Sequence, residues 1–209
     1  MRVLDIGRMP YNKVVDEMIR IRDERIQNEC PDTLIICEHD PVYTVGRTRG
    51  AADNLIGVDG IPVERVARGG DVTFHGPGQI VGYPVFLLPE HRHDLHGFMR
   101  GLEEVMICTL AAHGLEGGRD ERNTGVWIDG KKVMAIGIAA KRWVTWHGFA
   151  LNHTTDLEYF QRINPCGMNS ALVTKLADHI TPVPSRQTLV QEIVQHLNDW
   201  WQDWTDLPG

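Results

Sequence analysis

The chain has 209 residues, of which 42% are hydrophobic and 23% are charged, and its formal net charge is -7 at pH 7. This composition excludes the disordered and fibrous classes of protein, and the length predicts one domain, residues 1–209, that buries roughly 70% of the unfolded chain's surface. The acidic balance argues against general binding of nucleic acid or anionic membranes, because both are bound through Lys and Arg. No apolar run approaches the roughly 20 residues that cross a bilayer, and no cleavable leader pattern follows Met1, so we expect a cytoplasmic protein without membrane association.

The first half of the chain predicts one amphipathic helix and three strands. Apolar residues recur at helical spacing from Pro10 to about Ile26, and a proline suits the first turn of a helix. An Asp-Pro turn at 40–41 separates two short apolar runs, which we expect to form neighbouring strands. The three strands are expected at 33–37, 42–45 and 79–88.

The second half contains stronger signals at the ends of its elements. Asp94 has the position of an N-cap for a helix that ends near Gly114, and Ser185 can cap a last helix. Asp129-Gly130 supplies the positive φ angles of a two-residue turn and predicts a hairpin between 126–128 and 132–139. Because strands and helices mix without regular alternation, we predict an α+β domain. A further strand is expected at 143–152, and a short helix or turn at 155–160.

A glycine-rich segment from Arg68 to Tyr83 has the composition of a binding site. Its glycines allow positive φ angles or a close approach to a ligand, and its polar side chains can contact one. The polar candidates are Arg68, Thr73, His75 and Gln79.

The four cysteines are widely spaced without a zinc pattern, and we expect free thiols. Cys37 and Cys108 lie in apolar segments and are interpreted as small buried hydrophobes, whereas Cys30 has no polar residues around it in the sequence. Cys166 differs, because Pro165 stiffens the backbone before it and Gly167 frees the backbone after it. This arrangement can present a thiol to a substrate, so Cys166 is a candidate nucleophile.

A nucleophilic cysteine needs a base or cation beside it, because a thiol with a pKa of about 8.5 is mostly protonated at neutral pH. Adjacent strand residues face opposite ways, so only one of Lys131 and Lys132 can point into a site. The histidines at 91, 93 and 96 lack an accompanying acidic set, and we expect no metal site. The other candidate bases are His75, His147 and His153.

Five motifs that run in order between residues 38 and 176 together resemble the octanoyltransferases of lipoate biosynthesis. The run from Arg68 to Gln79, Arg-Gly-Gly-Asp-Val-Thr-Phe-His-Gly-Pro-Gly-Gln, is the most specific of them. The others are Glu-His-Asp-Pro-Val-Tyr-Thr-Val-Gly-Arg at 38–47, Thr-Gly-Val-Trp at 124–127, His-Gly-Phe-Ala-Leu-Asn at 147–152 and Pro-Cys-Gly at 165–167.

The resemblance implies the fold of biotin and lipoate protein ligases, a single α+β domain with a mostly antiparallel β-sheet flanked by helices. It implies transfer of an octanoyl group from octanoyl-acyl carrier protein to a specific lysine of a lipoyl domain, the first step of endogenous protein lipoylation. The implied acceptors are the lipoyl domains of 2-oxoacid dehydrogenase complexes and the glycine cleavage H protein. No ATP, metal, nucleic acid or membrane is implied, and the enzyme is expected to be a monomer.

The family's catalytic residues, carried over position by position, fall on Cys166 and Lys132, with Lys132 as general acid and base through an acyl-thioester on Cys166. Lys131 is then the outward neighbour. We expect oxyanion donors among the backbone amides from Gly76 to Gly78 or at Cys166. The family's substrate-binding segments fall on Arg68, Gly69, Gly70, Asp71, Val72, Thr73, Phe74, His75, Ala135, Ile136, Gly137, Gly148, Phe149 and Ala150.

Other activities are compatible with parts of this pattern. An ATP-dependent lipoate or biotin protein ligase shares the implied fold but needs no nucleophilic cysteine. A thioesterase or amidase would hydrolyse the same thioester, and a scaffold would bind lipoyl domains without chemistry. Because acyl carrier and lipoyl domains are usually acidic, we also predict a basic rim drawn from Arg47, Arg49, Arg65, Lys141 or Arg142.

Overall fold

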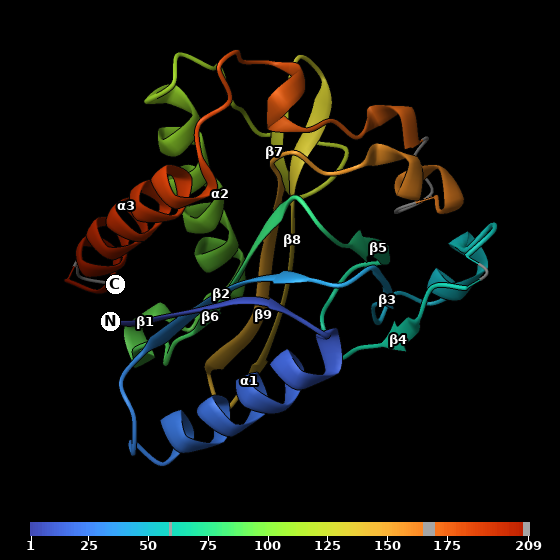
Figure 1. Ribbon diagram of the computed structural model, residues 1–209. Helices are drawn as coiled ribbons and strands as arrows, with labels where there is room; N and C mark the ends of the chain where they lie inside the picture. Colours follow the sequence, from blue (N-terminus) through green and yellow to red (C-terminus); the bar gives the residue numbers. More distant parts are fainter. Residues whose placement is uncertain (59, 165–169, 207–209) are drawn as a thin grey trace.

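The main sheet of the computed structural model, which describes residues 1–58, 60–164 and 170–206, has the strand order β1-β2-β6-β9-β8-β7 (Figure 1). The pair β1 and β2 is parallel, and the other pairs are antiparallel. The mostly antiparallel sheet expected from the sequence is therefore confirmed. Its strands are β1 Arg2–Met9, β2 Thr33–His39, β6 Gln79–Val85, β9 Val144–Asn152, β8 Lys131–Lys141 and β7 Gly125–Ile128.

A second, smaller sheet has the order β4-β3-β5, with β4 Val63–Arg65, β3 Val42–Val45 and β5 Val72–His75. Tyr43, Phe74 and Phe160 form the centre of its own hydrophobic core. The prediction that 33–37 and 42–45 form neighbouring strands is wrong, because β2 and β3 belong to different sheets. Since β2 pairs with β1 on one edge and β6 on the other, neither edge is left for β3.

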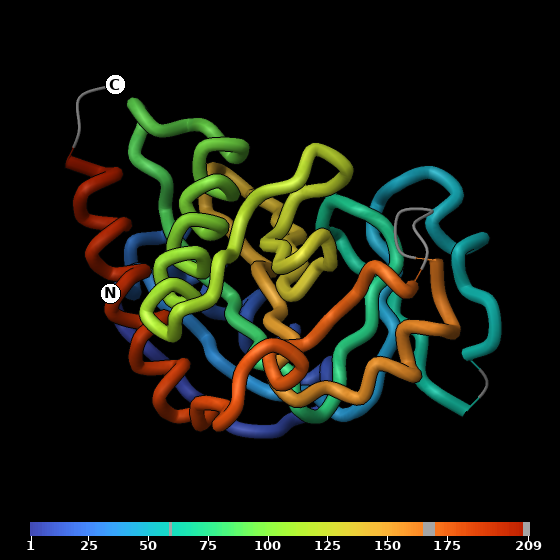
Figure 2. The backbone as a smooth tube through the Cα atoms, turned by 90° about the horizontal axis from the view of Figure 1, so that it is seen from above, coloured from blue at the N-terminus to red at the C-terminus, as the bar shows by residue number. Residues whose placement is uncertain are grey.

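Helices cover both faces of the main sheet (Figure 1). Helix α1 (Tyr11–Ile26) packs on one face, while α2 (Leu95–Ala111) and α3 (Arg186–Asp206) pack against each other on the opposite face. Successive side chains of β2 point to opposite faces of the sheet. Leu34 and Ile36 face α2 and α3, and Ile35 faces α1. Figure 2 shows the smaller sheet at the opposite end of the molecule from α2 and α3.

The predicted caps and the hairpin turn are confirmed. The Asp94 side chain accepts from the backbone N–H of His96 at 2.9 Å, and Ser185 Oγ accepts from that of Thr188 at 3.1 Å. Asp129 and Gly130 have φ angles of 49° and 72°, as a two-residue hairpin turn requires. Short 3-10 helices complete the chain at Ala51–Asn54, Glu90–Arg92, Leu157–Arg162, Ser170–Leu172 and Leu176–Asp178.

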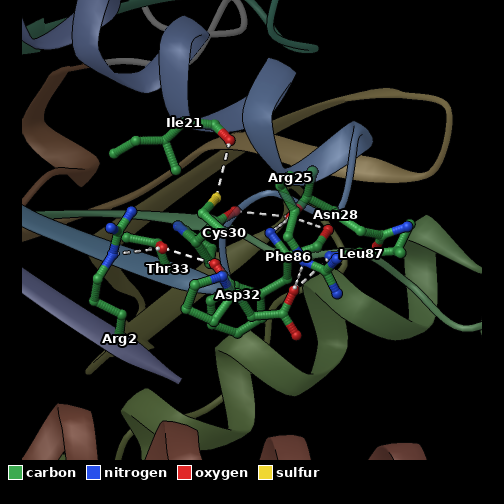
Figure 3. Close-up of polar contacts among 12 residues, drawn as sticks. Arg2, Ile21, Arg25, Asn28, Cys30, Asp32, Thr33, Phe86 and Leu87 are labelled. Atoms are coloured by element: carbon green, nitrogen blue, oxygen red, sulfur yellow. Dashed lines mark hydrogen bonds and ion pairs between the residues drawn. The ribbon is translucent and has the colours of Figure 1, made fainter.

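Asp32 joins the end of α1 to the main sheet (Figure 3). Its carboxylate accepts from Arg25 Nε, in the last turn of α1, at 2.7 Å and from the backbone N–H of Leu87 at 2.9 Å. The neighbouring Thr33 hydroxyl accepts from Arg2 Nε at 3.1 Å. These contacts fix β1, α1 and the end of β6 relative to one another.

The cysteines of the described chain are free thiols in different environments. Cys37 is buried, as predicted, and Cys30 is half-buried with its Sγ 3.6 Å from the carbonyl of Ile21 (Figure 3). The prediction that Cys108 is buried is wrong: it lies on the exposed face of α2, because Val105 and Thr109 occupy the inner positions. Across the ranges described, no helix combines the length and hydrophobicity needed to cross a bilayer.

Candidate active site

A cavity of about 420 Å³ is lined by both sheets and by the loop that carries Arg68. Almost all of the predicted binding residues lie on its wall, together with Lys132. The glycine-rich segment contributes Arg68, Gly69, Gly70, Asp71, Val72, Thr73 and His75, and the main sheet contributes Ala135, Ile136, Gly137, Gly148, Phe149 and Ala150.

Phe74 is the predicted binding residue that the cavity wall does not include. Its side chain is fully buried in the core of the smaller sheet, where it stacks on Tyr159 with ring centroids 4.4 Å apart. Alternation along β5 explains the difference, because Thr73 and His75 face the cavity while Phe74 points the other way.

The buried guanidinium of Arg68 holds the loop around the cavity. Its Nη2 donates to the carbonyl and hydroxyl oxygens of Thr44 at 2.9 and 2.8 Å. The next residue, Gly69, donates its N–H to the carbonyl of Ile138 at 3.0 Å and so seats the loop on β8. A Cβ at Gly137 would lie 2.8 Å from Arg68 Cδ and 3.2 Å from the Gly69 carbonyl oxygen, so a larger residue there would displace the arginine or its loop.

A chain of hydrogen bonds connects the glycine-rich segment to Lys132. His75 Nδ1 lies 3.2 Å from Gln79 Oε1, and Gln79 Nε2 donates to Asn152 Oδ1 at 3.0 Å. Asn152 Nδ2 donates to the carbonyl of Thr174 at 3.0 Å, and the Thr174 N–H donates to the carbonyl of Lys132 at 2.9 Å. The network fixes the positions of the predicted substrate wall and the predicted catalytic lysine relative to each other.

Lys132 lies on the cavity wall, whereas Lys131 is exposed, in agreement with the alternation of a strand. The Lys132 side chain is 9% exposed, and its Nζ donates to Asn123 Oδ1. The same Nζ lies 5.3 Å from the ring centroid of Trp127, the residue opposite Lys132 on β7. An amine is thus held at the wall of a cavity large enough for an acyl chain.

Cys166 lies outside the described residues. Before it, the N–H of Asn164 donates to the carbonyl of Asn54 at 2.9 Å, beside the smaller sheet. After it, Val173 forms a β-bridge with Lys132, and Thr174 binds the Lys132 carbonyl. The described chain therefore contacts the predicted catalytic lysine at Val173 and Thr174, seven and eight residues after Cys166 in the sequence.

The backbone amide of Gly78, one of the predicted oxyanion donors, already donates to Glu38 Oε2 at 3.0 Å. Pro77 has no N–H, and neither Gly76 nor Gly78 lines the cavity. The prediction of oxyanion donors between Gly76 and Gly78 is therefore not supported for Gly78 or Pro77.

Neutral imidazoles lie in and behind the cavity wall. Burial lowers the pKa of His39 to about 4 and that of His147 to about 3, and it holds the pKa of His75 well below its ordinary range. His39 Nε2 lies 2.8 Å from the hydroxyl of Tyr83. Among the described residues, neither ring nitrogen of His147 has a hydrogen-bond partner. The third candidate base, His153, lies off the cavity wall, with Nε2 2.8 Å from the Pro184 carbonyl.

Sequence reasoning missed several residues of the wall: Tyr11, Tyr83, Asn123 and Asn152. Tyr11 lies on the buried face of α1, within the helix expected from Pro10 to about Ile26, and its ring stacks on that of His75 with centroids 6.0 Å apart. Asn123 lies in a loop without periodicity, and its proximity to the Thr-Gly-Val-Trp motif was the one available signal.

The described ranges contain no cluster of three or more His, Cys, Asp or Glu side chains that could hold a metal ion. Two of the histidines considered for a metal have other contacts. His91 Nε2 lies 3.0 Å from the carbonyl of Thr205, and His93 stacks on Trp143 at 4.0 Å.

Known structures identify the class of the fold. The structure of a putative lipoate protein ligase from Thermoplasma acidophilum with bound lipoic acid is similar, with a TM-score of 0.74 at 18% identity over 96% of this chain and 86% of the other. The biotin protein ligase of Aquifex aeolicus has a TM-score of 0.60 at 10% identity, covering all of this chain and 72% of the other. The chain thus has the α+β fold of the lipoate and biotin protein ligases, as predicted.

Sequence relatives define the family within that class. The model of the lipoyl protein ligase A/B catalytic domain matches residues 14–198. An octanoyltransferase of Syntrophotalea carbinolica is 42% identical over 99% of this chain and 97% of its own length. Octanoyltransferases of Nostoc punctiforme and Rubrobacter xylanophilus are 45% and 46% identical, over 87% and 83% of this chain and 80% and 82% of their own lengths. The chain belongs to the octanoyltransferase family, and it is an acyltransferase.

Proposed function

We propose that the chain transfers the octanoyl group from octanoyl-acyl carrier protein to a lysine of lipoyl domains, through a thioester on Cys166 and with Lys132 as general acid and base. The acceptors are the lipoyl domains of 2-oxoacid dehydrogenase complexes and the glycine cleavage H protein. We further propose that the reaction uses neither ATP nor a metal, and that the enzyme acts as a cytoplasmic monomer.

The observation that carries the proposal is the location of the Lys132 amine. It lies at the wall of a cavity that is also lined by the predicted binding residues other than Phe74, and the Lys132 backbone is hydrogen-bonded to Thr174, eight residues after Cys166. The wall around the amine includes apolar and small residues that suit an aliphatic chain, among them Ala135, Ile136 and Phe149.

In the first step, the Cys166 thiolate attacks the carbonyl carbon of the donor thioester. The new carbon–sulfur bond forms on Cys166, and the bond to the carrier's sulfur breaks. Lys132 accepts the Cys166 proton and returns it to the departing carrier thiolate. The products are octanoyl-Cys166 and the free carrier thiol.

In the second step, the lysine amine of the lipoyl domain attacks the same carbonyl carbon. An amide bond forms, the bond to Cys166 breaks, and the proton lost by the amine passes through Lys132 to the Cys166 sulfur. Because an amide is more stable than a thioester, the overall transfer needs no nucleotide. One set of groups serves both steps, so ping-pong kinetics are expected.

The competing function is an ATP-dependent ligase, since the similar structures include a lipoate-protein ligase A bound with ATP. That fold likeness, at 18% identity, does not distinguish the two chemistries. A covalent acyl-enzyme formed without nucleotide would distinguish them, because a ligase proceeds through an acyl-adenylate.

Intact-mass measurement tests the proposal. The protein is mixed with octanoyl-acyl carrier protein in the absence of ATP, and an apo lipoyl domain is then added. We expect an octanoyl adduct that disappears as the lipoyl domain gains the same mass, and no adduct on Cys166→Ala. An adduct that persists on Cys166→Ala, or no adduct on the unaltered protein, contradicts the proposal. Loss of the adduct to free octanoate would indicate a thioesterase instead.

A further inference from the structure

The loop between α2 and β7 is fixed by a buried carboxylate. Glu103 of α2 is fully buried, and its Oε1 accepts from the backbone N–H of Gly125 at 2.9 Å. Its Oε2 accepts from Arg119 Nε and Arg100 Nη1, both at 2.9 Å. These bonds attach both ends of the loop to one side chain, so the residues between Arg119 and Gly125 have a defined path.

Further contacts fix Asn123 within this loop. Asp120 pairs with Arg122 at 2.6 Å and accepts the Asn123 N–H on its carbonyl at 3.3 Å. The indole Nε1 of Trp127 donates to the Asn123 carbonyl at 3.2 Å. Both the N–H and the carbonyl of Asn123 are therefore hydrogen-bonded, and these bonds fix the position from which its side chain extends.

The amide oxygen of Asn123 accepts a hydrogen bond from Lys132 Nζ. Because a lysine nitrogen faces it as a donor, the atom in contact must be the oxygen of the amide. Gly125 makes room for this arrangement: it has a φ of 137°, and a Cβ there would lie 2.9 Å from Lys132 Cε. The lysine stem thus passes directly over a glycine to reach the asparagine.

We propose that Asn123 is a positioning residue for the transfer reaction, which orients the Lys132 amine through a neutral acceptor. The proposal rests on the function proposed above for Lys132. An amide oxygen can accept from the protonated ammonium and from the neutral amine alike, so the contact persists while the lysine gains and loses its proton. In the neutral state, one N–H directed at Asn123 lets the nitrogen lone pair point toward another group.

A carboxylate in the same place would act differently, because an opposite charge favours the protonated form of a lysine. The choice of Asn over Asp is therefore central to the proposal. The elements around Lys132 also carry other charged groups. The loop has Arg119, Asp120, Glu121 and Arg122, and α2 has Arg100, Glu103 and Glu104; the hairpin has Asp129 and Lys131, Lys175 follows Thr174, and Arg68 and Asp71 lie on the same cavity wall. Cys166, the proposed proton donor, lies outside the described residues.

The test compares Asn123→Ala and Asn123→Asp with the unaltered protein in the rate of octanoyl-adduct formation from octanoyl-acyl carrier protein across pH, under single-turnover conditions. Asn123→Ala should be about tenfold slower or more at every pH, because the amine loses its orientation. Asn123→Asp should shift the midpoint of the pH profile upward by about one unit or more and regain much of its rate at high pH. Asn198→Asp on α3 makes the same charge change away from the cavity and should leave the profile unchanged.

Rates within twofold of the unaltered protein for both Asn123 variants would overturn the inference. It would also be overturned if both variants were slow with unshifted profiles and lowered melting temperatures, because Asn123 would then only support the loop. A Lys132→Met variant separates this failure from that of the proposed function. If Lys132→Met forms the adduct at the normal rate, the role of Lys132 itself is wrong, whatever the Asn123 variants do.

Discussion

Gln79 Nε2 donates to Asn152 Oδ1 at 3.0 Å, and this bond joins β6 to β9 in the interior beside the cavity. Both side chains are almost completely buried, with exposed fractions of 1% and 5%. Buried amides are stabilising only while their hydrogen bonds are made, so the pair makes the sheet sensitive to the loss of either partner.

Replacing one member of this pair should destabilise the protein. We expect Gln79→Leu or Asn152→Leu to lower the free energy of unfolding by about 1–3 kcal/mol, because each leaves a buried amide without its partner. The double variant should cost less than the sum, by about 1 kcal/mol. Urea denaturation of the four proteins measures the coupling, and strict additivity would show that the bond has no net energetic role.

The two adjacent lysines should differ sharply in their effect on transfer. We expect Lys132→Met to slow octanoyl transfer by about 100-fold or more, because it removes the proposed general acid and base while keeping an apolar stem. Lys131→Met, at the exposed neighbour, should stay within about twofold. Steady-state transfer to a lipoyl domain measures both, and similar losses in the two variants would contradict the assignment.

Stability should fall in mild acid because of the buried histidines. The pKa of His39 is about 4 in the folded protein, against an ordinary value of 6.5, so the unfolded chain binds a proton in this interval that the folded chain does not. The free energy of unfolding should therefore decrease from about pH 6.5 to pH 4, by up to about 1.4 kcal/mol per pH unit for this residue. Below pH 4, His39 is protonated in both the folded and the unfolded chain, and the stability that its neutral form contributes is lost.

His39→Gln should reduce this pH dependence, whereas His96→Gln, at an exposed position, should not. Urea denaturation at pH 7 and pH 5 measures the difference. The same slope in the unaltered protein and His39→Gln would exclude His39 as a source of the acid sensitivity.

The predicted basic rim divides into two groups, with Arg65 apart from both on the exposed edge strand β4 of the smaller sheet. Arg47 and Arg49 are exposed beside the cavity loop, where the Arg47 N–H donates to the Arg68 carbonyl at 3.1 Å. Lys141 is the last residue of β8 and Arg142 lies in the turn before β9, and Lys141 pairs with Asp23 at 3.1 Å. The first group is therefore the better candidate for an acidic carrier protein.

Reversing both charges of the first group, Arg47→Glu with Arg49→Glu, should raise KM for the carrier by about tenfold and weaken its dependence on salt. The same reversal at Lys141 and Arg142 serves as the matched control and should have little effect. Equal changes in the two double variants would indicate that net charge, and not a local surface, governs association.

Local signals in the sequence predicted much of this structure. The Asp94 cap, the Asp129-Gly130 turn and the opposite orientations of Lys131 and Lys132 depend only on near neighbours, and each is observed. The binding segments were located through the family resemblance, and their residues other than Phe74 line one cavity.

Features that depend on contacts between residues far apart in the sequence could not be predicted from local signals. Strand β1 was missed because its inward positions include Arg2 as well as Leu4, which weakens the apolar alternation. The separation of β2 and β3 into two sheets follows from β1 and β6 occupying both edges of β2, which no local pattern encodes. The contact of Asn123 with Lys132 similarly depends on a loop whose path is fixed by the Glu103 carboxylate of α2, which is distant in the sequence.

The strands beneath the cavity also serve both hydrophobic cores. Phe149 and Ile138 belong to the core under α2 and α3, and Ala150 belongs to the core under α1, yet all three line the cavity. A change of side-chain size at these positions would alter the packing of a helix layer as well as the shape of the site. During divergence of the family, variation in the acyl chain accepted should therefore arise more readily from the loop at 68–71 than from the sheet.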